Sequence, residues 1–99
     1  MLFARNVTFA VRDDKIDDFK GTFAVEVLPV LNAQPGFKSG LVLLNKAQAM
    51  SISVWEDRLS AENYETTAYG KVLDTLMPFL AASPTIERYD VGWQPTESR

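Results

Sequence analysis

Few side chains of this sequence could carry acid–base or nucleophilic chemistry. The chain has no histidine and no cysteine, which excludes the commonest general base, a thiolate nucleophile and the two commonest ligands of zinc. A general base would have to be a lysine, or a carboxylate whose pKa is raised by burial. The acidic pairs Asp13-Asp14 and Asp17-Asp18 do not supply one, because acids at such positions are typical of the solvated first turn of a helix. We therefore expect neither a metal centre nor another cofactor.

Aromatic, hydroxyl and amide side chains are the remaining candidates. Tyr64, Tyr69 and Tyr89 could hold a phenolic molecule by stacking or through their hydroxyl groups, but tyrosines on an apolar helix stripe are more often core residues. Asn6 could donate a hydrogen bond to a substrate oxygen or a developing oxyanion, or it could bond locally to backbone and solvent. Thr8 shares a strand face with Asn6, where small residues would leave room for a ligand or pack under a helix.

Length and composition indicate one globular domain. The 99 residues are 46% hydrophobic and 23% charged, which suits a single core over residues 1–93 followed by a polar tail over 94–99. The net charge of −3 disfavours nucleic acid and anionic membranes as partners. The sequence shows no signal peptide and no apolar run near the roughly 18 residues that span a bilayer, so a soluble, cytoplasmic protein is expected.

Hydrophobic periodicity predicts the element order β-α-β-β-α-β. Alternation with a period of two indicates strands, and apolar residues three and four apart indicate helices. The expected elements are strands over 2–11, 37–44, 50–55 and 86–93, a helix after Asp13-Asp14 with apolar positions up to Leu31, and a second helix from Ser60 that breaks near Tyr69-Gly70 and ends near Pro78. This order is typical of the ferredoxin-like α+β fold, an antiparallel sheet with both helices on one face.

Several local features are expected within the helices. Asp13-Asp14 are N-cap candidates for the first helix, and Pro29 should kink its last turn. Ser60 is the expected N-cap of the second helix, with a hydrophobic staple between Leu59 and Tyr64.

A monomer of this fold would leave one sheet face bare. Here neither face is reliably polar, because apolar residues occupy both faces of the strand over 37–44. An exposed apolar face on the order of several hundred Å² is a liability for a soluble monomer, and a symmetric dimer that packs sheet on sheet would cover it. Arg88 and Asp90 share a face of the last strand and are interpreted as an ion pair in solvent or at this dimer interface.

The order and spacing of four segments resemble a known family. The segments are Ala4-Arg5-Asn6 in the first strand; Leu28-Pro29 followed by Gln34-Pro35-Gly36-Phe37; the strand end Ile52-Ser53-Val54-Trp55-Glu56; and the broken helix leading to Leu76-Met77-Pro78-Phe79-Leu80 and a Tyr89-Asp90-Val91 strand. Together they are similar to the antibiotic biosynthesis monooxygenase family of dimeric α+β barrel proteins, over nearly the whole chain. The resemblance implies a homodimer whose two sheets form a barrel, with a pocket in each subunit between the sheet and the helices.

The resemblance also implies a chemistry. Members of the family include oxygenases that need neither metal nor flavin and act on electron-rich aromatic polyketides, as well as quinol monooxygenases and haem-degrading enzymes. Asn6 matches a strand-one asparagine that relatives place in the pocket, so it is the expected catalytic residue. The expected substrate-binding residues are Thr8, Trp55, Tyr64 and Tyr69. Trp55 could equally be structural, as the tryptophan at this strand end is in the family.

The haem-binding branch of the family is a poor match. Its iron-ligating histidine on the second helix has no counterpart, because the chain contains no histidine. Its tryptophan on that helix falls near Tyr64. Ligation of haem by Tyr64 or Tyr69 is the remaining alternative in this branch.

The function implied by the resemblance is a cofactor-independent monooxygenase of a phenolic or quinol-type aromatic small molecule, with Asn6 orienting the oxygenated group. The alternative is a non-catalytic dimer that binds a small molecule or has a structural role. A third hypothesis is an isomerase or dehydratase like other dimeric α+β barrel enzymes, which the absence of histidine disfavours. Oxygen uptake with anthrone- or hydroquinone-type substrates discriminates the first two.

Overall fold

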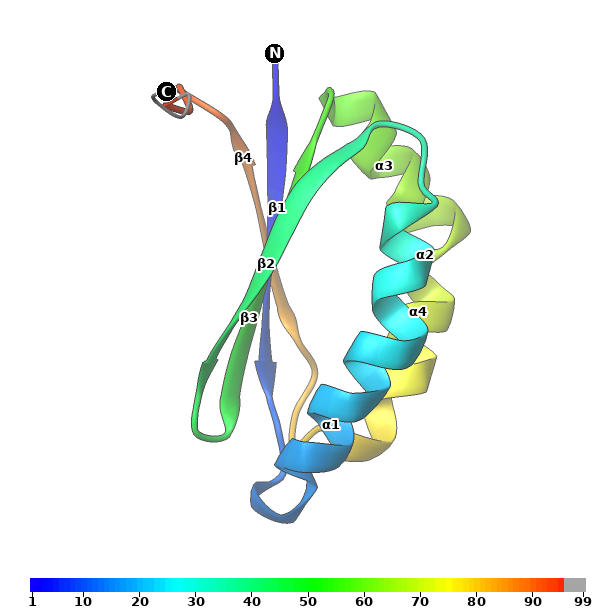
Figure 1. The fold of residues 1–99 in the computed structure, drawn as a ribbon, viewed down its shortest axis with the longest axis vertical. Coiled ribbons are helices and arrows are strands. Elements are labelled where there is room, and N and C mark those ends of the chain that lie inside the picture. Colours follow the sequence, from blue (N-terminus) through cyan, green and yellow to red (C-terminus); the bar gives the residue numbers. More distant parts are fainter. Residues whose placement is uncertain (96–99) are drawn as a thin grey trace.

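The computed structural model describes residues 1–95, which form an antiparallel sheet with helices packed on one face (Figure 1). The strands are β1 (Phe3–Ala10), β2 (Phe37–Asn45), β3 (Gln48–Trp55) and β4 (Thr85–Asp90), in the order β2-β3-β1-β4. The helices are α1 (Ile16–Thr22), α2 (Leu28–Asn32), α3 (Arg58–Thr67) and α4 (Tyr69–Leu76), with a π-helical turn over Phe23–Val27 and 3-10 turns over Asp13–Lys15 and Met77–Phe79. The predicted ferredoxin-like α+β fold is confirmed.

The last strand is shorter than predicted. It ends at Asp90, although the Val91 amide still donates to the Leu2 carbonyl at 2.9 Å. Pairing stops there because its partner β1 begins at Phe3, which lies opposite Asp90. Of the expected tail over 94–99, residues 96–99 lie outside the described residues, and the domain boundary stays a prediction.

Alternation in β1 decides which side chains face the helices. The buried positions, which face the helices, are Phe3, Arg5, Val7 and Phe9. Asn6 and Thr8 point to the opposite face, here called the outer face. Antiparallel pairing places Arg5 between Ser53 of β3 and Arg88 of β4. A charged side chain therefore lies in the middle of the buried sheet face.

The first helical stretch begins and bends differently from the prediction. Asp13-Asp14 lie in the first turn of a 3-10 helix, and Arg12 occupies the cap position instead. The tight turn lets the chain leave β1, with the Lys15 amide donating to the Arg12 carbonyl at 2.9 Å. The expected disturbance at Pro29 takes the form of the π-helical turn over Phe23–Val27, because the proline nitrogen has no proton to donate to the preceding turn.

Asp57, not Ser60, caps the second helix. The Asp57 carboxylate accepts a hydrogen bond from the Ser60 amide at 2.8 Å, which lowers the pKa of Asp57 and places Ser60 in the first turn. Leu59 is 74% exposed, so the predicted staple with Tyr64 is also wrong. The predicted break is confirmed, because α3 gives way to α4 at Ala68, whose φ of −128° is not helical.

The outer face of the sheet is largely apolar. Its larger apolar and aromatic side chains are Leu41, Leu43, Met50, Ile52, Val54 and Tyr89. Leu41, Leu43 and Tyr89 are exposed. In Figure 1 all the helices lie on the other side of the sheet, so this face lacks a cover among the residues described.

Candidate functional site

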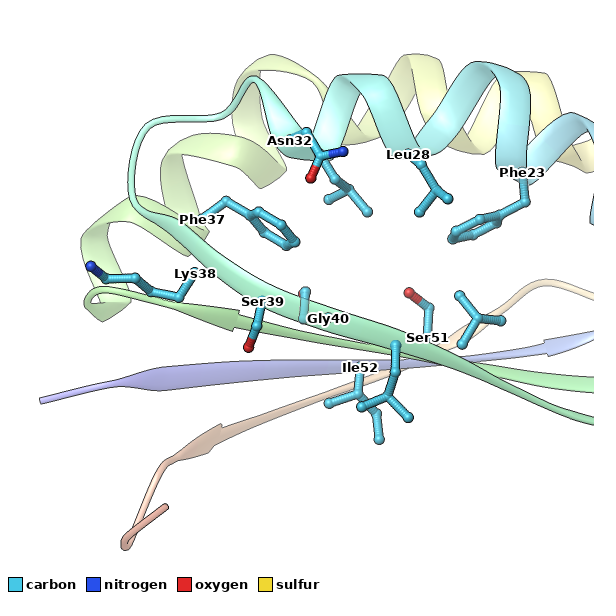
Figure 2. A pocket seen from close by; sticks show the side chains of 13 residues that line it. Phe23, Leu28, Asn32, Phe37, Lys38, Ser39, Gly40, Ser51 and Ile52 are labelled. Carbon is cyan, nitrogen blue, oxygen red and sulfur yellow. The ribbon is translucent and has the colours of Figure 1, made fainter. Parts of the chain in front are cut away.

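A cleft separates the helical layer from the β2 edge of the sheet. Its volume is about 520 Å³, and it lies between the stretch that ends in α2 and strands β2 and β3 (Figure 2). Phe23, Leu28 and Asn32 point into it from the helical side, and Phe37 faces them from β2. Small-molecule sites span about 300–1,000 Å³, so the cleft has room for an aromatic ligand of ordinary size.

A much smaller cavity, here called the inner cavity, lies between β1 and the helices. Its volume is about 20 Å³, close to that of a single water-sized probe. Arg5, Tyr64 and Tyr69 line it together with apolar side chains of β1 and the helices. The residues that line both the cleft and the inner cavity are Phe23, Leu31, Ser51 and Ser53. The two spaces therefore share a wall.

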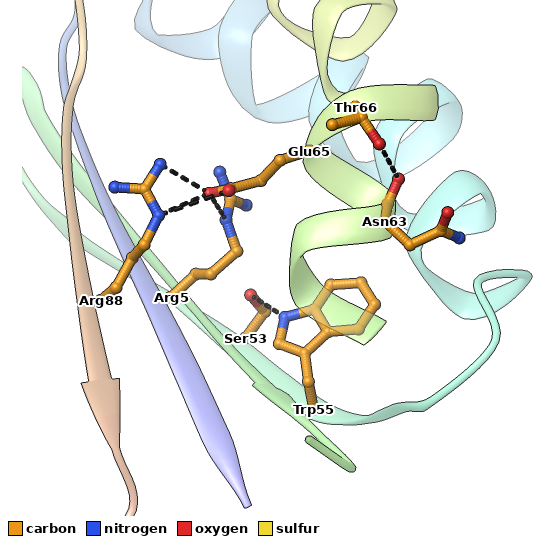
Figure 3. Close-up of polar contacts among 7 residues, drawn as sticks. All are labelled: Arg5, Ser53, Trp55, Asn63, Glu65, Thr66 and Arg88. Atoms are coloured by element: carbon orange, nitrogen blue, oxygen red, sulfur yellow. Dashed lines mark hydrogen bonds and ion pairs between the residues drawn. The ribbon is translucent and has the colours of Figure 1, made fainter. Parts of the chain in front are cut away.

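Arg5 brings a buried cation to the inner cavity. It is 2% exposed, and its Nε donates to Oε2 of Glu65 at 2.7 Å. Glu65 on α3 also pairs with Arg88 of β4, whose Nη2 lies 2.9 Å from the same oxygen (Figure 3). Burial alone would raise the pKa of Glu65, but the hydrogen bonds and charges of the two arginines outweigh it and lower that pKa below its ordinary value. At neutral pH two cations therefore share one anion.

Two tyrosines form an aromatic wall around the Arg5 guanidinium. Its central carbon lies 4.7 Å from the centre of the Tyr69 ring and 5.2 Å from that of Tyr64, within the range of cation–π attraction. Burial raises the pKa of Tyr64 to about 12 and also raises that of Tyr69, although the Arg5 charge opposes both shifts. Both phenols are therefore neutral at pH 7. Within residues 1–95, Nη2 of Arg5 and the buried hydroxyl of Tyr69 make no hydrogen bond of standard geometry, but the two side chains lie close enough together for a hydrogen bond from Arg5 to oppose the rise in the Tyr69 pKa.

Trp55 supports this wall from behind. Its side chain is fully buried, and its ring stacks on Tyr64 with centres 5.1 Å apart. The indole N–H donates to the Ser53 hydroxyl at 2.9 Å, which fixes the orientation of the ring (Figure 3). Trp55 therefore holds Tyr64 in place beside Arg5.

Comparison with known proteins places the fold. No protein-family model and no curated protein matches the sequence significantly. Solved structures do match: a candidate antibiotic biosynthesis monooxygenase from Nitrosomonas europaea has a TM-score of 0.81 at 19% identity, over 93% of this chain and 91% of that one. The fold is that of the antibiotic biosynthesis monooxygenases.

Two Streptomyces proteins share the antibiotic biosynthesis monooxygenase fold. SnoaB from Streptomyces nogalater, a cofactor-independent oxygenase, has a TM-score of 0.81 at 16% identity, over 97% of this chain and 98% of that one. The ActVA-Orf6 monooxygenase of Streptomyces coelicolor, solved in complex with nanaomycin D, has a TM-score of 0.79 at 17% identity, over 97% of this chain and 92% of that one. At these low sequence identities, the similarity shows a common fold.

Within this antibiotic biosynthesis monooxygenase fold, the predicted site residues fall into two groups. Tyr64 and Tyr69 line the inner cavity, and Trp55 packs behind Tyr64. Asn6 and Thr8 lie on the outer face, because they occupy the alternate positions of β1. The sheet itself separates them from the tyrosines, and the roles of all five residues remain predictions.

Arg5 and Glu65 belong to the site but were not predicted. The signal for Arg5 is a charge at an inward position of an otherwise apolar strand face, which needs a buried partner or a ligand. Glu65 carries no such signal, because 60 residues separate it from Arg5. The predicted pair of Arg88 and Asp90 is wrong. Arg88 binds Glu65, and the Asp90 carboxylate lies 3.9 Å from the Arg58 guanidinium.

The described residues were also compared with the requirements of a metal site and of a membrane-spanning helix, and they meet neither. Residues 1–95 contain no group of three or more histidine, cysteine, aspartate or glutamate side chains placed to hold a metal ion. Nor does any helix formed by those residues have the length and apolar composition needed to cross a membrane.

Proposed function

We propose that the protein is a cofactor-independent monooxygenase that binds a phenolic or quinol-type aromatic molecule in the cleft. The observation that carries the proposal is a largely apolar cleft that shares a wall with a cavity lined by the buried Arg5 side chain and by Tyr64 and Tyr69. A mostly apolar pocket with a few convergent polar groups is the common form of a small-molecule site. The likeness in fold to SnoaB and to ActVA-Orf6 supports the same kind of chemistry.

The cleft suits a flat ring. Phe23 and Leu28 on the helical side face Phe37 on β2, so both walls offer apolar surface (Figure 2). Gly40 leaves this part of β2 without a side chain. A Cβ there would lie 3.0 Å from the Ile52 carbonyl oxygen and 3.4 Å from the Phe37 ring. Apolar area buried by a ligand contributes about 25 cal/mol per Å². Such walls therefore favour an aromatic body over a sugar or a phosphate.

The reaction needs no group beyond the substrate and dioxygen. Loss of a proton to solvent converts an activated aromatic substrate into an electron-rich anion that can reduce dioxygen itself. An activated ring methylene is then oxidised to a carbonyl, which keeps one oxygen atom, while the other leaves as water with the two methylene hydrogens. The contribution of the protein is to bind the anion and to exclude water from it.

The predicted site residues take different parts in this proposal. Tyr64 and Tyr69 line the inner cavity next to the cleft, and Trp55 holds Tyr64 in place from behind. The predicted roles of Asn6 and Thr8 require a second copy of the chain to enclose a site on the outer face. Oδ1 of Asn6 is buried without a hydrogen-bond partner in residues 1–95, and a second copy could provide one.

The proposal includes a homodimer. The apolar side chains of the outer face, among them Leu41 and Leu43, would be covered if two copies packed sheet on sheet. A two-fold arrangement buries the same patch on both copies, so a single apolar face is sufficient.

Oxygen consumption tests the proposed function. With anthrone- or hydroquinone-type substrates the purified protein should consume dioxygen faster than buffer does, and labelled dioxygen should leave one labelled atom in the product. Ser51→Leu should remove most of the activity, because a larger side chain there fills the wall shared by the cleft and the inner cavity. Ser83→Leu, in the exposed loop before β4, is the matched control. Tight binding without oxygen consumption would favour the non-catalytic alternative.

A further inference from the structure

We propose that the aromatic substrate carries a linear alkyl chain, which lies in a second, apolar groove that continues from the cleft along the β2 edge of the sheet. This groove, here called the side groove, has a volume of about 240 Å³. Beyond the residues that it shares with the cleft, it is lined by Phe19, Lys20 and Ala24 of the first helical stretch and by Leu44 of β2. The inference rests on the proposed function and adds the substituent that sets its substrate apart from a bare ring.

The side groove and the cleft are continuous. Phe23 and Leu28 of the helical stretch line both spaces, and so does Val42 of β2. Phe23 lies at the end of the cleft farthest from Phe37 and Lys38 (Figure 2). Because the shared residues come from both walls, a chain that leaves the cleft between them enters the side groove directly.

The helical wall of the side groove contains a gap. Lys20 and Ala24 lie four residues apart and so occupy one row of the helix surface, in which Ala24 offers only a methyl group. The π-helical turn then brings Leu28 next to Phe23, because the Leu28 amide donates to the Phe23 carbonyl five residues earlier. The small side chain of Ala24 therefore leaves open a path that begins between Phe23 and Leu28.

The opposite wall comes from the end of β2. Val42 and Leu44 occupy alternate positions opposite Ser51 and Ala49 of β3, on the sheet face that the helices cover. Leu44 is nevertheless 47% exposed, and Leu28 across the groove is 41% exposed. A ligand chain in the side groove would cover apolar surface that residues 1–95 leave in contact with water.

The lining selects the chemistry of the occupant. Among the described residues around the side groove, only Lys20 carries a polar side chain, and it is exposed, so its ammonium group can remain in water. A hydroxyl or amide substituent would lose hydrogen bonds to water there and gain none. Methylene groups gain from burial instead. A linear alkyl chain is therefore the occupant that the groove favours.

The position of the groove favours part of a ligand over a second copy of the chain. A second copy seated on Leu28 and Val42 would also have to cover the cleft, because these residues belong to both spaces. An alkyl chain attached to a ring in the cleft occupies both spaces at once and keeps the ring in its place.

A series of 4-alkylphenols tests the proposal on the unmodified protein. Calorimetric titration without oxygen, using 4-methyl-, 4-butyl- and 4-hexylphenol, should show an affinity that rises about two- to fourfold for each added methylene. 4-tert-Butylphenol has the same number of carbon atoms as 4-butylphenol but is too short to reach past Phe23. It should bind about fivefold more weakly than the linear isomer.

Two substitutions on the same helical turn locate the alkyl chain. Ala24→Phe fills the side groove and should remove the advantage of the longer chains, while 4-methylphenol still binds as it does to the unmodified protein. Val25→Phe is the matched control, because Val25 is 74% exposed and lies outside the groove. It should keep the full dependence on chain length. Unchanged binding of 4-methylphenol shows that each variant is folded.

The outcomes separate the alkyl chain from the alternatives. Equal affinity for the linear and branched butylphenols, or the same dependence on chain length in Ala24→Phe, overturns the proposal. A change of Ala24→Phe from dimer to monomer in native mass spectrometry also overturns it, since a second copy would then occupy the groove.

Failure of this proposal is distinguishable from failure of the proposed function. If the alkylphenols bind as expected but anthrone- and hydroquinone-type compounds consume no oxygen, the side groove stands and the monooxygenase fails. If alkylated and unsubstituted hydroquinones consume oxygen with equal kcat/KM, the monooxygenase stands and the side groove has no part in choosing the substrate.

Discussion

At the scale of single residues, Arg5 and Glu65 determine the chemistry of the candidate site. A guanidinium in an apolar core would be strongly unfavourable without a counter-ion, and Glu65 on α3 provides it. The faces of Tyr64 and Tyr69 add cation–π attraction. Nη2 of Arg5 makes no hydrogen bond of standard geometry in residues 1–95, so the ion pair with Glu65 provides most of the stabilisation of this buried charge.

Glu65→Gln should lower the free energy of unfolding by about 2–3 kcal/mol at neutral pH, because the variant leaves two arginines without their shared carboxylate. Glu62→Gln, an exposed neighbour on α3, should change it little. Urea denaturation monitored by tryptophan fluorescence measures both. A Glu65→Gln protein as stable as the unmodified one would mean that the ion cluster is not formed in solution.

The same comparison should depend on pH. The pKa of Glu65 is lower in the folded chain than its ordinary value, so the stability it contributes is complete above the ordinary value and is lost as pH falls through the lowered one. The difference between the unmodified protein and Glu65→Gln should therefore be largest near neutral pH and shrink in acid. A difference that stays constant down to acidic pH would contradict the assignment of the shift to Glu65.

At the scale of elements, the turn between α2 and β2 fixes one wall of the cleft. Gly36 has φ +82°, a conformation that side chains disfavour, and its carbonyl accepts a hydrogen bond from the Glu56 amide at 2.7 Å. A Cβ on Gly36 would also collide with the Ser60 side chain at the start of α3. One glycine thus lets α2, β2 and α3 meet.

Gly36→Ala should lower the free energy of unfolding by about 2–4 kcal/mol, through backbone strain and the contact with Ser60. Gly21→Ala is the matched control, because Gly21 is an exposed residue of α1 and a Cβ there meets open space among the described atoms. It should raise stability by about 0.5–1 kcal/mol. Thermal and urea unfolding of the two variants should therefore shift in opposite directions.

At the scale of the whole molecule, the exposed apolar side chains of the outer face predict that the protein forms a homodimer. Leu41 and Leu43 of β2 are exposed beside the apolar side chains of β3, and the helices cover the opposite side (Figure 1). Patches of this kind mark interaction sites in soluble proteins. A second copy, related by a two-fold axis, would cover the patch with its own equivalent.

Native mass spectrometry should find a species near twice 11.1 kDa. Leu43→Glu should convert it to a monomer, because a carboxylate would be buried in the interface. Leu59→Glu, equally apolar to charged but on the exposed start of α3, should leave the dimer intact. If the unmodified protein is a monomer, or if both variants are dimers, the outer face is not the dimer interface.

The sequence by itself determined the element order, the two faces of β1 and the break between α3 and α4. These follow from local rules, because alternation, helical spacing and helix-breaking residues act over a few positions. The resemblance to the antibiotic biosynthesis monooxygenases, read from four spaced segments, agrees with the fold of the matching structures. Tyr64 and Tyr69 could be selected in the same way, as aromatic residues on a predicted helix.

Only the tertiary structure decided which of the candidates share a site. Alternation placed Asn6 and Arg5 on different faces, but which face receives the helices depends on packing across the whole chain. Arg5 and Glu65 meet across 60 residues of sequence. The capping of α3 by Asp57 likewise depends on where β3 ends and α3 begins. Local sequence patterns reflect interactions between residues that are close in sequence. A buried ion pair and a cavity, in contrast, exist only once distant segments have packed together.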